Sequence, residues 1–403
     1  MNERQHTMDS CFQLNDTQTM LRDSLARLLS ALYKTEQRTH LLDNARNWPP
    51  LWHELTNELG ILGLSFSEAL GGLGGGMHDN LVVMETLGTS LAAEPYLSTI
   101  VIAGGVFKRL ANPEARQMLA RMLHGDAVVA WAATEPGSRY DWHDVRTSLT
   151  PSADGQKYLL HGRKTVVRCA PWATHLLVTA RSQGTTRERD GLSLVCIPAQ
   201  TAGVHCNDVR TIDGGVASEL SFDNVMVSPS QIMGPVGQAL PLIEQVMDEA
   251  TLALCAEAMG VLQRLLHDTV DYARQRKQFG VAISSFQALQ HRLADMYLAM
   301  EQAAALTASV AEALEASRRS GERLEAEVRQ RTAELRVKAE QLERSLASVA
   351  RERAARLVET GLREGDAQPP AEAVSVEELR RVLGPARGAL RAIPSVLPSG
   401  TAI

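Results

Sequence analysis

The residues best suited to bind a ligand lie in a short basic turn. Arg276 is followed by Lys277 and Gln278 and then by the pair Phe279 and Gly280. A guanidinium pairs bidentately with phosphate, an aromatic ring offers a flat apolar surface, and glycine lets a backbone come close to a ligand. The combination predicts contact with a flat, anionic ligand.

Apolar residues on both sides of this turn recur at helical spacing. Before the turn they are Leu262, Leu265, Leu266, Val270 and Ala273. After the turn they are Phe286, Leu289, Leu293, Met296 and Met300. The pattern predicts two helices joined by the turn, and an ordinary helical hairpin with a basic connection is the alternative to a ligand site.

The stretch from Arg276 to Met296 resembles the acyl-CoA dehydrogenase family, whose signature reads R-x-x-FG-x-x-I-x-x-FQ and then LADM. Over roughly the first 315 residues, the resemblance implies an α+β FAD flavoprotein. Its parts are a helical N-terminal domain, a central β-barrel or sandwich domain and a C-terminal helical bundle. It also implies that Arg276 contacts the FAD pyrophosphate of a neighbouring subunit. The other signature positions expected at the cofactor are Gln278, Phe279, Ile283, Phe286 and Gln287.

A second candidate segment contains Thr134-Glu135-Pro136, which alone would be read as an ordinary turn. In the family the matching segment lies along the flavin ring, and its threonine and backbone bond the polar edge of the ring. The resemblance therefore assigns Thr134, with the backbone around Ala133 and Ser138, to the isoalloxazine.

The chain departs from the family pattern beside this segment. Most members read GxGSD after TEP, and here the residues are GSRYD. The K-x-W-x-T strand that backs the flavin is here KTVVR, so Val166 takes the place of the stacking aromatic and Arg168 that of a small hydroxyl. The SRYD variant, the KTVV strand and the later ALCAEAMG most resemble the small subunit of pimeloyl-CoA dehydrogenase and related steroid-chain dehydrogenases. Such small subunits usually pair with a large subunit.

Composition bounds the class of protein. The chain has 403 residues, 44% hydrophobic and 22% charged, enough for two or three domains with a sizeable core. The net charge of −6 gives no reason to expect a nucleic-acid partner, and no apolar run approaches the ~20 residues that cross a membrane. The N-terminus lacks a signal-peptide core, and the five cysteines have no CxxC spacing. These features predict a cytoplasmic protein with reduced thiols and no metal site.

Apolar patterning divides the chain into segments. Residues 1–127 read as a helical domain with stripes over 21–32, 52–62, 82–91 and 115–123. Residues 128–234 read as a β domain, and the resemblance implies that this domain carries the flavin and acyl-CoA site. Its expected strands are Val128–Ala133, Tyr158–His161, Thr165–Val167, Leu176–Ala180, Leu192–Ile197 and Glu219–Phe222. Residues 235–316 form a helical domain that is truncated relative to the family.

The C-terminal part departs from the family. In residues 317–360, apolar residues recur seven apart at Val328, Leu335, Leu342 and Val349. This spacing predicts a coiled coil, with a solvated single helix as the alternative. Residues 361–403 read as a mostly flexible tail with one candidate helix, Ser375–Leu383.

The base for the family reaction is missing from its usual places. A carboxylate must take the α-proton of the acyl thioester while the flavin takes the β-hydride. Most members supply it in an EGT-like motif after a GGxG turn, and this chain has neither. Other members place it on the helix before the hairpin, where Ala250 falls. The neighbouring Glu249 is a weak candidate, because a helix turns about 100° per residue. Its alternative is a surface charge near a helix N-terminus.

The absent GGxG turn would also bind the adenine end of a neighbouring subunit's FAD, so half of a shared site is missing. One hypothesis is an FAD-dependent acyl-CoA dehydrogenase of fatty acid metabolism. It would be the small subunit of a heteromer, or a homo-oligomer, with electron-transfer flavoprotein as a candidate acceptor. A second is a catalytically inactive assembly or binding subunit. A third is a nonfunctional product with an altered C-terminus.

Overall fold

The computed structural model describes residues 14–33, 48–138, 141–213 and 215–320, together with helical positions 330, 334 and 341. The chain divides into two compact units, residues 1–311 with 402–403, and residues 312–401. In the second unit residues 312–320 are helical. None of the helices within the described ranges has both the length and the apolar character needed to cross a membrane.

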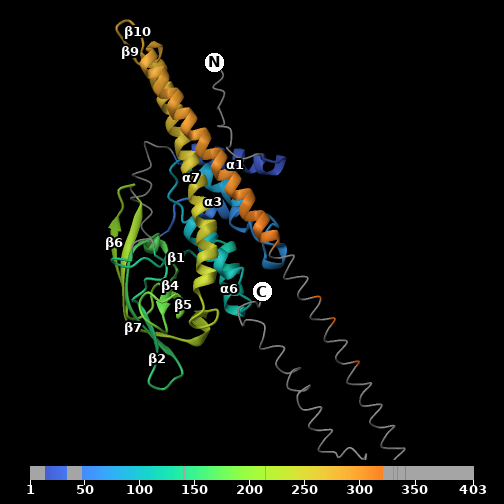
Figure 1. Ribbon diagram of the computed structural model, residues 1–403, viewed down its shortest axis with the longest axis vertical. Coiled ribbons are helices and arrows are strands. Elements are labelled where there is room, and N and C mark those ends of the chain that lie inside the picture. Colours follow the sequence, from blue (N-terminus) through green and yellow to red (C-terminus); the bar gives the residue numbers. More distant parts are fainter. Residues whose placement is uncertain are drawn as a thin grey trace, which may run out of the picture. The chain divides into compact units, whose positions relative to one another are not determined.

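Helices form the N-terminal part of the first unit (Figure 1). They are α1 Asp16–Leu32, α3 Trp52–Asn57, η2 Ile61–Gly63, η3 Glu68–Leu70, α4 Met77–Thr89, the π-helical η4 Leu97–Ala103, α5 Gly104–Phe107 and α6 Pro113–Leu123. The Asn15 side chain caps α1 by accepting a hydrogen bond from Gln18 N at 2.9 Å, and Gln18 caps Asn15 N in return. Gln18 also donates to Asp79 of α4 at 3.0 Å, so the cap joins two helices.

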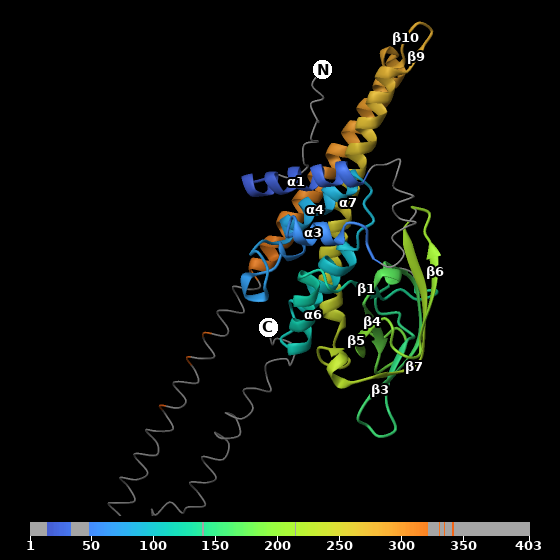
Figure 2. The same ribbon diagram turned by 180° about the vertical axis from the view of Figure 1, so that it is seen from behind.

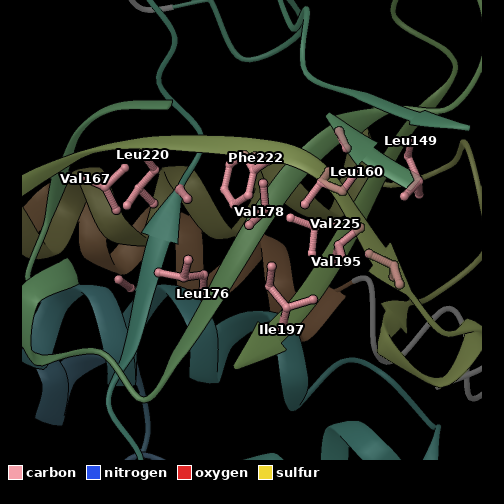
Figure 3. Close-up of a cluster of buried hydrophobic side chains, with 14 of the residues drawn as sticks. Leu149, Leu160, Val167, Leu176, Val178, Val195, Ile197, Leu220, Phe222 and Val225 are labelled. Atoms are coloured by element: carbon pink, nitrogen blue, oxygen red, sulfur yellow. The ribbon is translucent and has the colours of Figure 1, made fainter. Parts of the chain in front are cut away.

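A single eight-stranded sheet makes up the β domain. Its strands are β1 Val129–Ala132, β2 Ser148–Pro151, β3 Tyr158–Arg168, β4 His175–Arg181, β5 Leu192–Pro198, β6 Val204–Arg210, β7 Val216–Val227 and β8 Ile232–Met233. The order is β6-β7-β3-β2-β4-β5-β8, and β1 pairs in parallel with β4. Buried side chains from several strands, among them Leu160, Val178 and Phe222, form its core (Figure 3).

A bulge in β3 changes which side chains face that core. β3 pairs with β7 at Lys164↔Leu220 and next at Val167↔Ser218, so β3 carries an extra residue between these pairs. Strand side chains alternate between faces, and an added residue shifts the alternation. Lys164 and Val167 are both buried, and Val166 consequently faces outward.

Helix α7, Leu240–Gln275, packs along α4 at close range. A Cβ on Gly88 would lie 2.1 Å from the Glu257 carbonyl oxygen, and a Cβ on Gly260 would lie 1.9 Å from that of Glu85. Only glycine fits at these two contacts. After α7 come β9 Lys277–Gln278, β10 Val281–Ala282 and η7 Ile283–Ser285. Residues 287–311 then return as a helix beside α7 (Figures 1 and 2).

The predicted α+β order of helical, β and helical parts is confirmed. The expected helices over 21–32, 82–91 and 115–123 correspond to α1, α4 and α6, and the two runs expected at 158–161 and 165–167 are one strand, β3. Strands β2, β6 and β8 and the helical stretch 97–107 were not predicted. β6 reads VHCNDVR and is almost wholly exposed, so it lacks the alternation that marks a half-buried strand. The coiled-coil prediction and the tail prediction lie outside the described residues, apart from 317–320 and the three helical positions.

Candidate active site

The segment after β1 lies against β3 and leaves two side chains open to a ligand. Thr165 N donates to the Thr134 carbonyl at 2.8 Å. The Thr134 side chain is exposed, and its hydroxyl has no hydrogen-bond partner in the part of the chain that the structure describes. The neighbouring Val166 is 54% exposed. A hydroxyl and an apolar side chain are therefore available together. We call these two residues the ring face.

Val166 reaches this exposed position through an unfavourable backbone conformation. Its φ is +49°, a region that β-branched residues rarely adopt. Glu219 of β7 supports the bulge, because its Oε1 accepts from Thr165 Oγ1 at 2.6 Å and from Val166 N at 3.3 Å. A conformation of this kind costs on the order of 1–3 kcal/mol and persists where the surroundings enforce it.

The other two residues predicted on this segment are engaged within the protein. The Ala133 carbonyl accepts from Lys164 Nζ at 3.2 Å. The Ser138 side chain is buried, and its hydroxyl bonds both the peptide N–H and the carbonyl of Glu135 at 3.0 Å. Thr134 is thus the polar side chain of the segment that is free to meet a ligand.

A buried ion pair lies beneath the ring face. Lys164 Nζ contacts Glu135 Oε1 at 2.7 Å, and both side chains are buried. Burial lowers the pKa of Lys164 to about 8, although Glu135 opposes the shift. Burial would raise the pKa of Glu135, but the charge of Lys164 and hydrogen bonds from Lys164 and Thr147 lower it overall. The pair is therefore ionised at neutral pH.

Three further charged groups gather at the end of β3. Arg168 Nη2 lies 2.9 Å from Asp213 Oδ2. Burial opposes ionisation of Asp213, but hydrogen bonds from Thr211 and Gly215 and the charge of Arg168 lower its pKa to about 2. Burial raises the pKa of Glu257 on α7; Arg168 opposes the shift and Asp213 adds to it. Glu257 thus combines partial burial with an increased tendency to hold a proton.

Glu249 lies elsewhere on α7, in an ion pair. Its carboxylate contacts Arg109 directly and lies 3.7 Å from Lys108 Nζ. The side chain is buried, so the alternative reading as a surface charge is wrong. Its carboxylate is thus engaged by two cations within the protein. Ala250, where other members place the base, is fully buried.

The hairpin tip carries the remaining predicted residues, and they are largely exposed. Phe279 is 92% exposed, and its ring meets Phe286 edge-on at 6.3 Å. Arg276 is exposed, and its guanidinium makes no ion pair with any described residue. Gln278 and Gln287 are exposed, and Ile283 is half-buried and donates its peptide N–H to the Arg276 carbonyl at 2.8 Å. We call Arg276–Gln287 the hairpin tip.

The ring face and the hairpin tip do not come together within one chain. Both views show the β9–β10 turn at the end of α7 remote from the β domain (Figures 1 and 2). From Glu257, which interacts with the end of β3, α7 continues for about 27 Å to Gln275 at 1.5 Å per residue. The two groups could therefore contact one ligand only if they came from different chains.

The residues fit FAD in these two halves. The ring face offers an apolar side chain and a free hydroxyl to an isoalloxazine and its polar edge. The hairpin tip offers the exposed guanidinium of Arg276, which makes no ion pair with a described residue, to a pyrophosphate, and it also offers an exposed aromatic ring. The donors suit the cofactor, provided that two chains contribute them.

Sequence reasoning missed the groups that support the ring face. These are Lys164, Glu135, Thr147, Thr179 and Glu219, with Asp213 and Glu257 alongside. The spacing of the strand did indicate that Lys164 is buried. Lys164 follows Leu160 by four positions and Gly162 by two, so all three lie on the same, inward face of β3. A lysine on that side needs a buried acidic partner.

Three domain models of one family match consecutive parts of the chain. The acyl-CoA dehydrogenase N-terminal domain matches residues 15–126, the middle domain 130–225 and the C-terminal domain 238–335. The last match extends past residue 315, where the resemblance was expected to end.

Individual proteins agree with these matches. A probable acyl-CoA dehydrogenase, YngJ, of Bacillus subtilis is 26% identical over 72% of this chain and 77% of its own length. The ChsE4-ChsE5 complex from Mycobacterium tuberculosis contains a chain with a TM-score of 0.65 and 27% identity, covering 76% of this chain and 80% of that one. The FAD complex of PigA gives a TM-score of 0.64 and 25% identity over 73% and 77%. With all three domains matched in order, this chain belongs to the acyl-CoA dehydrogenase family.

Proposed function

We propose that this chain is a subunit of an FAD-dependent acyl-CoA dehydrogenase and that a second subunit completes its flavin site. The reaction removes one hydrogen from each of the α and β carbons of an acyl-CoA thioester. The observation that carries the proposal is the distance between the ring face and the hairpin tip. A second chain that brings a cation to the pyrophosphate of an FAD whose ring lies on the ring face would restore a whole site.

The favoured partner is a large subunit of the same family. The SRYD variant, the KTVV strand and the ALCAEAMG segment resemble small subunits of pimeloyl-CoA and steroid-chain dehydrogenases. The ChsE4-ChsE5 complex supports this arrangement, since it joins two chains and one of them resembles this chain. A homo-oligomer is the alternative, with the hairpin tip of one copy at the ring face of another.

When bound, FAD supplies the acceptor for the hydride that leaves the β-carbon. Thr134 would hold the polar edge of the ring through its hydroxyl, and Val166 would supply an apolar contact to the ring. Arg276 of one subunit holds the pyrophosphate of the other by a charge-assisted pair. The bulge in β3 keeps Val166 outward before any ligand arrives, so this half of the site is preorganised.

Glu257 is the best-suited acceptor for the α-proton among the described carboxyl groups of α7. It has a raised pKa, and no described residue makes a hydrogen bond to its side chain. It also stands seven residues after Ala250, on nearly the same helix face but about 10 Å further along the axis. A base works best when its pKa approaches the working pH. We therefore assign the proton transfer to Glu257 in place of Glu249.

An inactive assembly subunit is the second candidate function. It is favoured by Arg168, a bulky cation at a position where most members have a hydroxyl, and by the buried Ala250. In that case the hairpin tip would still complete a flavin site on the partner.

The deciding experiment is the absorbance spectrum of the purified chain, alone and after co-expression with a candidate large subunit. We expect little flavin in the isolated chain and a yellow complex that bleaches anaerobically with acyl-CoA substrates. A colourless, stable complex would favour the assembly role, and aggregation would favour a product with an altered C-terminus. Strong bleaching by the isolated chain would contradict the need for a partner. Reoxidation by electron-transfer flavoprotein would identify the acceptor.

A further inference from the structure

Lys164 lies directly beneath the ring face with its side chain wholly buried. Its ammonium donates to Glu135 Oε1 at 2.7 Å, to Thr179 Oγ1 at 2.9 Å and to the Ala133 carbonyl at 3.2 Å. An ammonium has three N–H donors, so these three partners satisfy it completely.

Glu135 extends the same network to a third segment of the chain. Its Oε1 accepts from Thr147 N at 3.0 Å and its Oε2 from Arg146 N at 2.8 Å. The Thr147 hydroxyl in turn donates to the Arg163 carbonyl at 3.2 Å. One ion pair thus joins the segment after β1, the middle of β3 and the residues that lead into β2.

Stability alone does not account for a buried pair of this kind. Desolvating two charges costs several kcal/mol, and apolar replacements of similar volume are often neutral or stabilising. The pair instead determines backbone positions. Lys164 binds the Ala133 carbonyl, and Thr165 N binds the carbonyl of the following residue, Thr134. Lys164 is also the last inward-facing residue of β3 before the bulge that turns Val166 outward.

We propose that Lys164 and Glu135 are positioning residues whose ion pair fixes Thr134 and Val166 for the flavin ring without touching it. The choice of ligand rests on the proposed function. The effect on the two backbone segments does not, and it can be measured without FAD.

The pH dependence follows from the surroundings of the pair. Glu135 interacts with two cations, Lys164 and Arg181, and its charge favours the protonated form of each. Burial lowers the pKa of Lys164 from 10.5 to about 8. The unfolded chain therefore holds more protons between these values, so the Lys164 contribution makes the fold more stable as pH rises through this window. Above about pH 8 Lys164 loses its proton, and with it the ammonium that fixes the ring face. FAD binding should therefore weaken above pH 8, although the protein stays folded.

The first test uses hydrogen–deuterium exchange in the full chain without FAD. In Lys164→Met and Glu135→Gln we expect faster exchange in peptides covering 133–138 and 164–168, and unchanged exchange in α4. Lys157→Met removes an exposed lysine and should behave like the parent protein. Unchanged exchange in both peptides would overturn the proposal. If Lys164→Met fails to fold, Glu135→Gln decides, because it preserves side-chain shape.

The second test measures FAD affinity against pH in the complex with the partner subunit. We expect affinity about tenfold weaker in Lys164→Met, with loss of the transition near pH 8. Glu135→Gln should move the transition to lower pH, because the ammonium loses the anion that favours it. A transition that both variants leave in place would contradict the assignment. If the parent complex binds no FAD at any pH, the proposed function fails, and the exchange measurement still judges the positioning role.

Discussion

The ring face and the hairpin tip are both expected at the same cofactor, and they are built in opposite ways. Beneath the ring face lies a buried ion pair with hydrogen bonds to three chain segments. The hairpin tip has a two-residue strand pair, exposed aromatics and a guanidinium without an ion pair in the described chain. In the proposed site, one half is shaped in advance within the chain, whereas the other offers exposed groups to a ligand shared with a second chain. In such a shared site, substitutions at the ring face should change the chemistry of the flavin ring, whereas substitutions at the hairpin tip should change how tightly the cofactor is bound.

The largest expected effect concerns proton transfer beside the ring face. Glu257→Gln should reduce the rate of flavin bleaching in the assembled complex by about 10²- to 10⁴-fold, because an amide cannot accept the proton. FAD content should stay the same. Glu244→Gln is the matched control, since Glu244 is an exposed α7 carboxylate that lies 2.6 Å from Arg189. A normal rate in Glu257→Gln would return attention to Glu249, to be tested by Glu249→Gln.

A substitution at the hairpin tip should act on retention instead. Arg276→Ala should weaken FAD affinity by about 10- to 100-fold, since a hydrogen bond to a charged group contributes roughly 1.5–3 kcal/mol. Equilibrium dialysis of the complex measures this change. Arg274→Ala removes an exposed arginine two residues earlier, 3.8 Å from Asp271, and should leave affinity unchanged. Equal effects of the two variants would show a general charge effect and no specific contact.

A smaller effect is expected from the free hydroxyl of the ring face. Thr134→Val keeps the shape of the side chain and removes the donor, so affinity should fall about tenfold or less. The flavin absorbance and the reduction potential should shift as well. Thr150→Val on β2 is the control, because Thr150 is also exposed. If spectrum and potential both match the parent protein, Thr134 does not bond the ring.

The smallest effect separates strain from function at Val166. Val166→Gly should raise the free energy of unfolding by about 1 kcal/mol, because relief of the positive φ outweighs the entropy cost of glycine. FAD affinity should fall in the same variant, since the ring loses its apolar contact. Denaturant titration gives the first quantity. Val209→Gly, at a strand residue without positive φ, should be destabilising. A loss of stability in Val166→Gly would mean that its packing matters more than its backbone strain.

Sequence reasoning reached the architecture more readily than the working parts of the site. Apolar spacing located α1, α4 and α6, and the family resemblance placed Thr134 and Arg276 in separate segments. It did not reveal the direction of Val166, because the bulge depends on pairing with β7 and no local pattern marks it. Glu257 was missed for a related reason. Its raised pKa comes from burial and from Asp213, a residue of the distant β6–β7 connection.

The contact of α4 with α7 through Gly88 and Gly260 has a consequence for how the gene can change. Every single-nucleotide missense change in a glycine codon adds at least a Cβ, and at both positions that atom would lie about 2 Å from a carbonyl oxygen. Even the smallest substitution, glycine to alanine, is therefore expected to disturb the contact at either position. A Cβ at Gly260 forces α7 away from α4, and with it Glu257, one turn earlier on the same helix. Substitutions at these two codons should thus reduce function without changing any residue of the ring face or the hairpin tip.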